Sequence, residues 1–136
     1  MGHFKIDILS PSQVVAQSVE ADLVVIPTVR GQITVLPEHT HVVSNLDLGI
    51  LQLSCDGNES HYLLDGGVCK VLGEKITILS SSCISASEID FERAKIELKE
   101  CRQKLADLKE LSTEDIDLWL RKERRSELQI SMANLL

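Results

Sequence analysis

The sequence predicts an α+β protein, with an N-terminal antiparallel β-sandwich over residues 1–85 and a C-terminal two-helix hairpin over residues 86–136. Two observations support this fold class. Before Ser85, short β-prone runs are separated by glycine and Asx residues, and after it apolar residues recur every three or four positions. Because the first half lacks helical segments that could serve as crossovers, we expect its strands to pair antiparallel.

Seven short runs in the first half are typical of β-strands. The first, FKIDIL, places Phe4, Ile6 and Ile8 on one face, because side chains alternate along a strand. The others are ADLVVIPT, QITVLP, GILQLSC, SHYLLD, GVCKVLG and KITILSS. Residues that accept positive φ lie between the runs and predict hairpin turns at Arg30-Gly31, Asp56-Gly57-Asn58, Asp65-Gly66-Gly67 and Gly73-Glu74.

The first predicted helix follows Ser85. Ser85 and Glu88 have the spacing of a capping box, in which each side chain satisfies a backbone donor of the first turn. An apolar stripe then follows the helix, through Phe91, Ala94, Leu98, Cys101, Leu105 and Leu108.

A second helix is predicted from about Thr113 to the C-terminus, with Ser112 as its N-terminal cap. Its apolar stripe begins with Ile116, Trp119 and Leu120. The next positions expected on that stripe hold charged residues instead, Glu123, Arg124 and Glu127. A helix with a weak apolar face folds mainly through tertiary packing. We therefore expect the second helix to be the more mobile part of the chain.

Composition and charge exclude several function classes. The chain has 136 residues, a net charge of −7 and 3% aromatic residues. An acidic chain with few aromatic rings is poorly suited to nucleic acid, which is bound by basic and stacking surfaces. Apolar runs fall short of the roughly 20 residues that span a bilayer, and the N-terminal residues lack the pattern of a signal peptide. We expect a protein that is cytosolic or bound to a cytosolic partner.

The cysteines and histidines do not form a recognisable metal or catalytic motif. His39 and His41 would point the same way on an extended segment, but a catalytic zinc needs a third protein ligand. They are interpreted as histidines at the rim of the β-structure. Motifs such as GxSxG and GxxxxGK[ST] are absent from the sequence. With no CxxC pair, the cysteines are interpreted as structural thiols at Cys55, Cys69, Cys83 and Cys101.

The segment IDFERA, residues 89–94, has two interpretations. It can be the first turns of a capped helix, where the helix dipole favours Asp90 and Glu92. It can also be a small-ligand site formed by Asp90 and Arg93, one turn apart on one helix face.

A basic cluster in the second helix also has two interpretations. It is either a solvated helix face or a surface for an acidic partner, and it contains Arg121, Lys122, Arg124 and Arg125.

In their order and spacing, several segments resemble the epsilon subunit of the bacterial F-type ATP synthase. IPTVRGQITVLPEHT, residues 26–40, is similar to VPxxxGxxGxLPGHxP of that family, and LDLGILQL is similar to KPGxLxI. YLLDGGVCKVLGEKITILSSSCISASEID is similar to YxVxGGFxEVxxNxVTVLAxxAxxAEEID, and IDFERA to [IL]DxxRA. The resemblance covers residues 3 to about 108. Glu38 is its main departure, since the family has glycine there.

The resemblance implies a non-catalytic subunit of the rotating central stalk, which couples proton flow to ATP synthesis. In this family the sandwich contacts the gamma subunit and the loops of the c-ring. An extended hairpin contacts the beta and alpha subunits and restrains ATP hydrolysis. The complex holds such a subunit at the cytoplasmic face of the bacterial inner membrane, as a peripheral protein. The corresponding docking edge here comprises Arg30, Gly31, Glu38, His39 and His41.

Some members of that family bind a regulatory ATP at [IL]DxxRA, although no cofactor is required. The resemblance therefore implies a nucleotide site at Ile89, Asp90, Arg93 and Ala94. Arginines of the second helix contribute in those members, so their location makes candidates of Arg121, Arg124 and Arg125.

Two alternative functions remain open from the residues alone. One is a stand-alone sensor of a nucleotide or another small ligand, which would use Asp90 and Arg93. The other is a metal-dependent enzyme built on His39 and His41, which predicts stoichiometric zinc in the purified protein.

Overall fold

The computed structural model describes residues 3–36 and 41–135. The chain forms two compact units, Met1–Ser85 and Ala86–Leu136. Within its described residues, the first unit contains ten strands: β1 (Phe4–Leu9), β2 (Val14–Ala21), β3 (Leu23–Thr28), β4 (Gly31–Val35), β5 (Val42–Leu46), β6 (Gly49–Cys55), β7 (Asn58–Leu64), β8 (Gly67–Leu72), β9 (Lys75–Leu79) and β10 (Cys83–Ser85).

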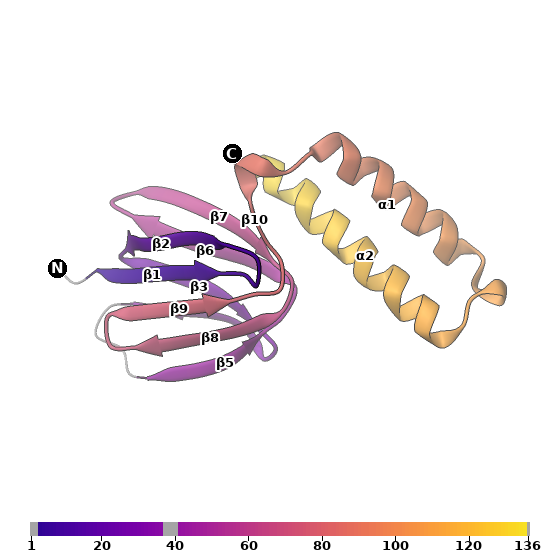
Figure 1. Cartoon of the computed structure of the whole chain (residues 1–136). Coiled ribbons are helices and arrows are strands. Elements are labelled where there is room, and N and C mark those ends of the chain that lie inside the picture. The colour runs from indigo at the N-terminus through magenta and orange to yellow at the C-terminus, as the bar shows by residue number, and fades with distance from the viewer. Residues whose placement is uncertain (1–2, 37–40, 136) are drawn as a thin grey trace. The chain divides into compact units, whose positions relative to one another are not determined.

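The strands follow the path β10-β7-β6-β3-β5-β8-β9-β1-β2, and β4 pairs with β3. β3 pairs with β5 at one register position, Thr28 with Leu46. The sheet therefore folds over at this point into two layers, as Figure 1 shows. The predicted β-sandwich is confirmed.

The core lies between the two layers. Phe4, Ile6 and Ile8 are fully buried, which confirms the predicted inward face of the first strand. Burial of apolar surface contributes about 25 cal/mol per Å², so this cluster is the main source of the unit's stability. Its members are Phe4, Ile6, Ile8, Ala21, Val24, Ile26, Val35, Leu46, Leu51, Leu53, Leu64, Cys69, Val71, Ile76 and Ile78.

Strands β2, β5 and β10 were not predicted from the sequence. In β2, the register with β1 shifts between Ile6 and Ile8, and Ser18 has a φ of 52°. This bulge breaks the alternation of buried and exposed residues that identifies a strand in a sequence. The other two strands are short, at five and three residues, and carry weak patterns.

One pair of strands departs from the predicted antiparallel arrangement. β1 and β9 run parallel, from Lys5 opposite Lys75 to Leu9 opposite Leu79. The prediction that every pair is antiparallel is therefore wrong. It assumed that a parallel pair needs a helical crossover, whereas here the strands between β1 and β9 make the connection.

The predicted turns differ in their outcome. Hairpins join β3 to β4, β6 to β7 and β8 to β9, as predicted. The segment Asp65-Gly66-Gly67 is not a hairpin, because β7 and β8 pair with other strands and the segment joins the two layers. A Cβ atom at Gly67, with φ of 123°, would overlap the backbone of Leu79 and Ser80. This corner therefore requires glycine.

The second unit consists of two helices, α1 (Phe91–Ala106) and α2 (Thr113–Ser131), which pack against each other as the predicted hairpin. Short 3-10 turns accompany them: η1 (Ala86–Glu88), η2 (Leu108–Glu110) and η3 (Met132–Leu135). Of the predicted α1 stripe, Ala94 and Cys101 are buried, while the side chain of Leu108 lies outside the described residues. On α2, Ile116 and Trp119 are half-buried and Leu120 is 47% exposed, which agrees with the weak apolar stripe predicted for this helix.

The two helices begin at different kinds of cap. Asp90 caps α1, because its Oδ1 accepts the backbone N–H of Arg93 at 3.1 Å. The predicted capping box is wrong, since Ser85 ends β10 and Glu88 lies in η1. The predicted cap of α2 is confirmed, with Ser112 Oγ accepting the N–H of Asp115 at 3.1 Å.

Candidate functional site

An apolar row crosses the outer face of the layer formed by β2, β1, β9, β8 and β5. Strand register aligns Val14 with Leu9, Leu9 with Leu79 and Leu79 with Val68. Val14 is 58% exposed, Leu79 49% and Val68 39%. Val43 on β5 is 69% exposed and lies on the same face, opposite Lys70, which is two residues from Val68 on β8. Adjacent exposed apolar side chains of this kind are typical of a protein-docking surface.

Sequence reasoning missed this row. Each residue of the row lies on the outward face of its strand, where a polar residue is expected. In the sequence, such a residue therefore appears only as an interruption of the alternation between apolar and polar positions. Register between strands brings these residues together, and the sequence does not specify that register. The useful signal would have been an apolar residue at outward positions of several runs, such as Leu79 in KITIL.

The predicted turn at Arg30-Gly31 connects β3 to β4. Thr28 Oγ1 donates to the carbonyl oxygen of Gly31 at 2.6 Å and accepts the N–H of Arg30 at 3.2 Å. Gly31 has a φ of 112°, which favours glycine. Because Val29 donates its N–H to the carbonyl of Asn45 at 3.1 Å, the turn lies beside the end of β5.

Of the predicted docking edge, the described residues are Arg30, Gly31 and His41, and the Arg30-Gly31 turn and His41 lie at opposite ends of β5. His41 is exposed and precedes β5, whereas the Arg30-Gly31 turn lies beside the last residues of that strand. The five-residue strand β5 separates them, which corresponds to about 14 Å. Glu38 and His39 lie outside the described residues.

The residues of the predicted nucleotide motif lie at the start of α1. Asp90 holds the helix cap, Ala94 is buried and Ile89 is half-buried. The guanidinium of Arg93 pairs with Glu97, with Nε 3.1 Å from Oε1. Asp90 and Arg93 are therefore joined through a backbone N–H, and the Arg93 side chain points along the helix to Glu97.

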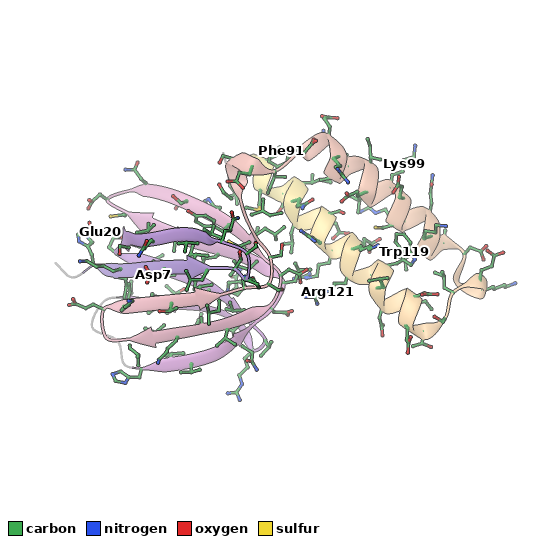
Figure 2. The ribbon with its side chains drawn as sticks, in the orientation of Figure 1. Asp7, Glu20, Phe91, Lys99, Trp119 and Arg121 are labelled. Atoms are coloured by element: carbon green, nitrogen blue, oxygen red, sulfur yellow. The ribbon has the colours of Figure 1, made fainter. Side chains whose placement is uncertain are left out.

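The basic cluster lies farther along the hairpin. Arg121 and Arg124 are exposed and Arg125 is half-buried, while Lys122 stacks 4.7 Å above the Trp119 ring. Figure 2 shows Arg121 on α2 and Phe91 at the start of α1.

The position of the cluster follows from ion pairs between the helices. Arg102 of α1 contacts Glu123 at 3.8 Å and Glu127 at 3.5 Å, so this part of α2 lies level with Arg102. Arg93 is nine residues earlier on α1 and lies about 13 Å away along the helix axis. In this arrangement the basic cluster and the nucleotide motif are not brought together.

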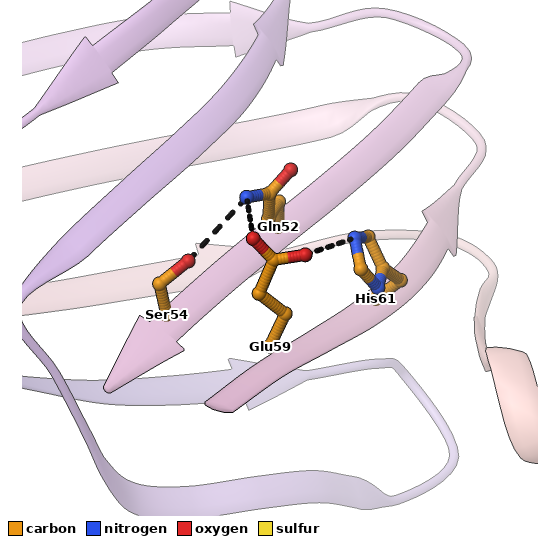
Figure 3. A network of polar contacts seen from close by, with 4 residues as sticks. All are labelled: Gln52, Ser54, Glu59 and His61. Atoms are coloured by element: carbon orange, nitrogen blue, oxygen red, sulfur yellow. Dashed lines mark hydrogen bonds and ion pairs between the residues drawn. The ribbon is translucent and has the colours of Figure 1, made fainter. Parts of the chain in front are cut away.

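A polar network on β6 and β7 includes His61, which is buried. Gln52 Nε2 lies 3.3 Å from Glu59 Oε1 and 3.4 Å from Ser54 Oγ. His61 is 6% exposed, and its Nε2 lies 3.8 Å from Glu59 Oε2, as Figure 3 shows. These contacts pair residues across one hairpin and give His61 a structural role.

Cys55, Cys69, Cys83 and Cys101 are free thiols. Cys69 and Cys101 are buried, and burial raises the pKa of both thiols. Burial also raises the pKa of Cys55, and the neighbouring carboxylates of Asp56, Asp22 and Glu20 raise it further. A protonated thiol is a poor nucleophile, so these three residues are unsuited to covalent catalysis.

Known proteins similar to this chain identify its family. The family model for the ATP synthase, Delta/Epsilon chain, beta-sandwich domain matches residues 3–86. The ATP synthase epsilon chain of Carboxydothermus hydrogenoformans is 38% identical over 102 residues, which cover 75% of each chain. The ATP synthase epsilon chain of Persephonella marina is 30% identical over 133 residues, which cover 97% of each chain.

A solved structure adds a comparison of folds. A chain of the Euglena gracilis mitochondrial ATP synthase matches with a TM-score of 0.75 and 20% identity, covering 100% of this chain and 83% of that one. The match includes both units, so the relative shares the β-sandwich and the helices. Together with the family match and the curated relatives, these findings confirm the resemblance seen in the sequence. The chain belongs to the epsilon-chain family of the ATP synthases and is a non-catalytic subunit of the central stalk of that complex.

Proposed function

We propose that the sandwich docks on the gamma subunit and the c-ring loops, and that the hairpin regulates ATP hydrolysis by contacting the beta and alpha subunits. In this role the chain couples proton flow to ATP synthesis without a catalytic site of its own. The observation that carries the docking proposal is the apolar row on a sandwich that matches the family domain, in which exposed Val14, Leu79 and Val68 flank half-buried Leu9.

The docking surfaces divide between two partners. We assign the apolar row and Val43 to gamma, because a stable rotor contact needs apolar burial. His41 borders this face at the start of β5, and Glu38 and His39 precede it in the sequence, so we assign all three to the same contact. The tight turn at Arg30-Gly31 projects from the end of the β3–β4 hairpin and is assigned to the polar c-ring loops.

The location proposed for the chain follows from these partners. Among the described residues, no helix is long and apolar enough to cross a membrane. We propose that the chain reaches the cytoplasmic face of the bacterial inner membrane as a peripheral subunit, held there through gamma and the c-ring.

The hairpin has the properties of a regulatory element. The buried side chains of α1 are small, Ala94 and Cys101, and that of α2 is Ser126. The ion pairs of Arg102 with Glu123 and Glu127 are partly exposed and contribute little, on the order of 1 kcal/mol each at most. A helix pair held this modestly can exchange its contacts for those of another subunit.

A regulatory ATP is the ligand we propose for the start of α1, on the strength of the complete Ile89, Asp90, Arg93 and Ala94 motif. Because Arg93 pairs with Glu97, a phosphate group must compete with that carboxylate for the guanidinium. The basic cluster would have to approach the motif through a rearrangement of the hairpin, since it lies about 13 Å away along the helix axis.

Co-purification with gamma tests the docking proposal. We expect the wild-type chain to bind gamma from the same organism, and the double variant Val68→Ser and Leu79→Ser to lose binding. Ile96→Ser is the matched control, because Ile96 is 61% exposed but lies on α1, outside the sandwich, and should leave gamma binding unchanged. A wild-type chain that does not bind gamma while other synthase subunits associate would overturn the proposal.

The regulatory part is tested separately, in the assembled enzyme. Truncation after Ala86 should raise the rate of ATP hydrolysis, and an unchanged rate would show that the helices do not regulate it. Calorimetry with magnesium-free ATP should detect binding that Arg93→Ala abolishes and Glu97→Gln strengthens. If the chain binds ATP but does not bind gamma, the result would instead support the function of a stand-alone sensor. Absence of binding in the wild type would remove ATP from the proposal.

A further inference from the structure

Four side chains that can bind a metal ion meet at one corner of the sandwich, although they are far apart in the sequence. They are His3, Asp22, Cys55 and Asp56. Their ligand atoms, a histidine nitrogen, a thiol sulfur and two carboxylate oxygens, all lie within 4.8 Å of one another. This corner lies at the start of β1, whereas the apolar row crosses the end of that strand at Leu9.

Pairing of β1 with β2 places the first two of these residues side by side. The register pairs Phe4 with Ala21, so that the next position outward sets His3 against Asp22. Asp22 is also the single residue between β2 and β3, where the chain changes partners. Its place at the corner is therefore fixed by strand pairing on both sides.

Pairing of β3 with β6 brings the other two residues to the same point. The register pairs Leu23 with Ser54, so that Asp22 lies beside Cys55. The N–H of Asp22 donates to the carbonyl oxygen of Ser54 at 2.8 Å, and the N–H of Asp56 donates to Asp22 Oδ2 at 3.2 Å. These two hydrogen bonds hold Asp22 against the β6–β7 hairpin, which carries Cys55 and Asp56.

We propose that His3, Asp22, Cys55 and Asp56 bind one divalent transition-metal ion, of which Zn²⁺ is the best match. Imidazole and thiolate ligands favour zinc and related ions over Ca²⁺ and Mg²⁺, which prefer oxygen ligands alone. Four protein ligands complete a tetrahedral shell without a position for water, which is typical of structural zinc sites. The proposed ion would tie the start of β1 to the β2–β3 corner and to the β6–β7 hairpin.

The side chains can close on an ion without moving the strands. At zinc–ligand distances of about 2.0–2.3 Å, tetrahedral ligand atoms lie roughly 3.3–3.8 Å apart. Because all the ligand atoms lie within 4.8 Å of one another, no pair has to close by more than about 1.5 Å. His3, Asp22 and Cys55 are half-buried and Asp56 is exposed, so an ion can enter from solvent past Asp56.

The proposed binding of the metal ion balances in charge and in protons. In the metal-free protein the Cys55 thiol lies 3.9 Å from Asp56 Oδ2 and is its donor. On binding, the thiol proton leaves to solvent and the sulfur–metal bond replaces it. The two carboxylates and the thiolate bring three negative charges against the two positive charges of the ion. The bound corner therefore carries one negative charge, with no redox step.

Cobalt substitution tests the site directly, with untagged full-length chain so that no added histidines bind the metal. Titration with CoCl₂ should produce a thiolate-to-cobalt charge-transfer band and the intense visible bands of tetrahedral cobalt, saturating at one ion per chain. Zn²⁺ should displace cobalt and raise the thermal unfolding midpoint, since it binds the folded state. Cys55→Ser should abolish the charge-transfer band, and His3→Ala should weaken zinc binding by at least about tenfold.

Matched variants show whether the metal lies at this corner. Cys83→Ser removes another half-buried cysteine and His41→Ala another histidine, and both should leave the cobalt spectrum unchanged. Should Cys55→Ser fail to fold, His3→Ala decides the question, because His3 lies outside the strands. Absence of a charge-transfer band in the wild type, or its loss in either control instead, would overturn the proposal. These outcomes do not depend on binding to gamma.

Discussion

The sandwich and the helical hairpin are stabilised in different ways. The sandwich encloses one continuous core in which large side chains such as Phe4, Ile26 and Ile76 are fully buried. In the hairpin, the buried residues of α1 and α2 are the small side chains of Ala94, Cys101 and Ser126. Half-buried apolar side chains such as Leu98, Ile116 and Trp119 add further contact, and Asp90 and Ser112 cap the helices.

This difference in packing agrees with the roles we propose, in which the sandwich is a docking platform and the hairpin a regulatory element. A unit with a large apolar core opens only by global unfolding, whereas an element with few buried contacts opens locally at a lower free-energy cost. A docking platform needs the first property, because its outer face must keep a fixed shape. A regulatory element needs the second, because it must leave its resting contacts.

The largest expected effect is in the sandwich core. Ile76→Ala removes a fully buried side chain and should lower the free energy of unfolding by about 2–5 kcal/mol, through lost burial and a cavity. Leu98→Ala, at a half-buried position on α1, should cost no more than about 1 kcal/mol. Urea denaturation measures both values. Equal costs would contradict the comparison, because they would mean that the hairpin packs as tightly as the sandwich.

The sequence predicted the elements of both units better than their connections. Alternation in FKIDIL identified the buried face of β1, and Ser112 identified the start of α2, because both signals are local. The parallel pairing of β1 with β9 and the β7–β8 corner at Gly67 depend on strands far apart in the chain. The β1–β2 bulge at Ser18 concealed β2, since it interrupts the period that reveals a strand.

In the candidate site, too, the sequence predicted contiguous features but not those that depend on strand pairing. The motif at Ile89–Ala94 is contiguous and could be read directly, and so could the turn at Arg30-Gly31. The apolar row of Val14, Leu79 and Val68 arises from register between three pairs of strands, so no single run contains it. The separation of His41 from Arg30 also follows from the direction of β5, which the sequence does not specify.

The next largest effect is at the helix caps. Asp90→Ala should destabilise the hairpin by about 1 kcal/mol, because the N–H of Arg93 loses its acceptor. Ser112→Ala should have a similar effect on α2. Hydrogen exchange should show faster opening of the α1 amides in the first variant, with protection of the sandwich amides unchanged.

Two controls sharpen the capping prediction. Asp90→Asn should retain most of the protection, because asparagine is an equally good cap. Glu88→Ala should leave α1 unaffected, since Glu88 lies in η1 and not at the cap. If the cap variants loosened the sandwich as much as the helices, the two units would unfold as one, and the contrast between them would fail.

The smallest expected effect concerns the pH dependence of the sandwich. Asp7 Oδ1 accepts the N–H of Ser18 at 2.8 Å, at the bulge between β1 and β2. This hydrogen bond, with a smaller contribution from Lys75, holds the pKa of Asp7 below its ordinary value of 3.8. A carboxyl with a lowered pKa in the folded state stabilises the protein above its unfolded pKa, and the stabilisation is lost as the pH falls through the folded value.

Asp7→Asn should therefore reduce the loss of sandwich stability below pH 3.8 and leave its stability near neutral pH slightly lower. Lys75→Ala is the matched control and should retain most of the wild-type pH dependence, because the backbone hydrogen bond is the larger cause of the shift. Thermal unfolding followed across this pH range, with strand and helix amides resolved by NMR, measures the effect. Since Asp7 and Ser18 both belong to the sandwich, the hairpin amides should respond identically to acid in all three proteins, and a hairpin response specific to Asp7→Asn would show coupling between the units.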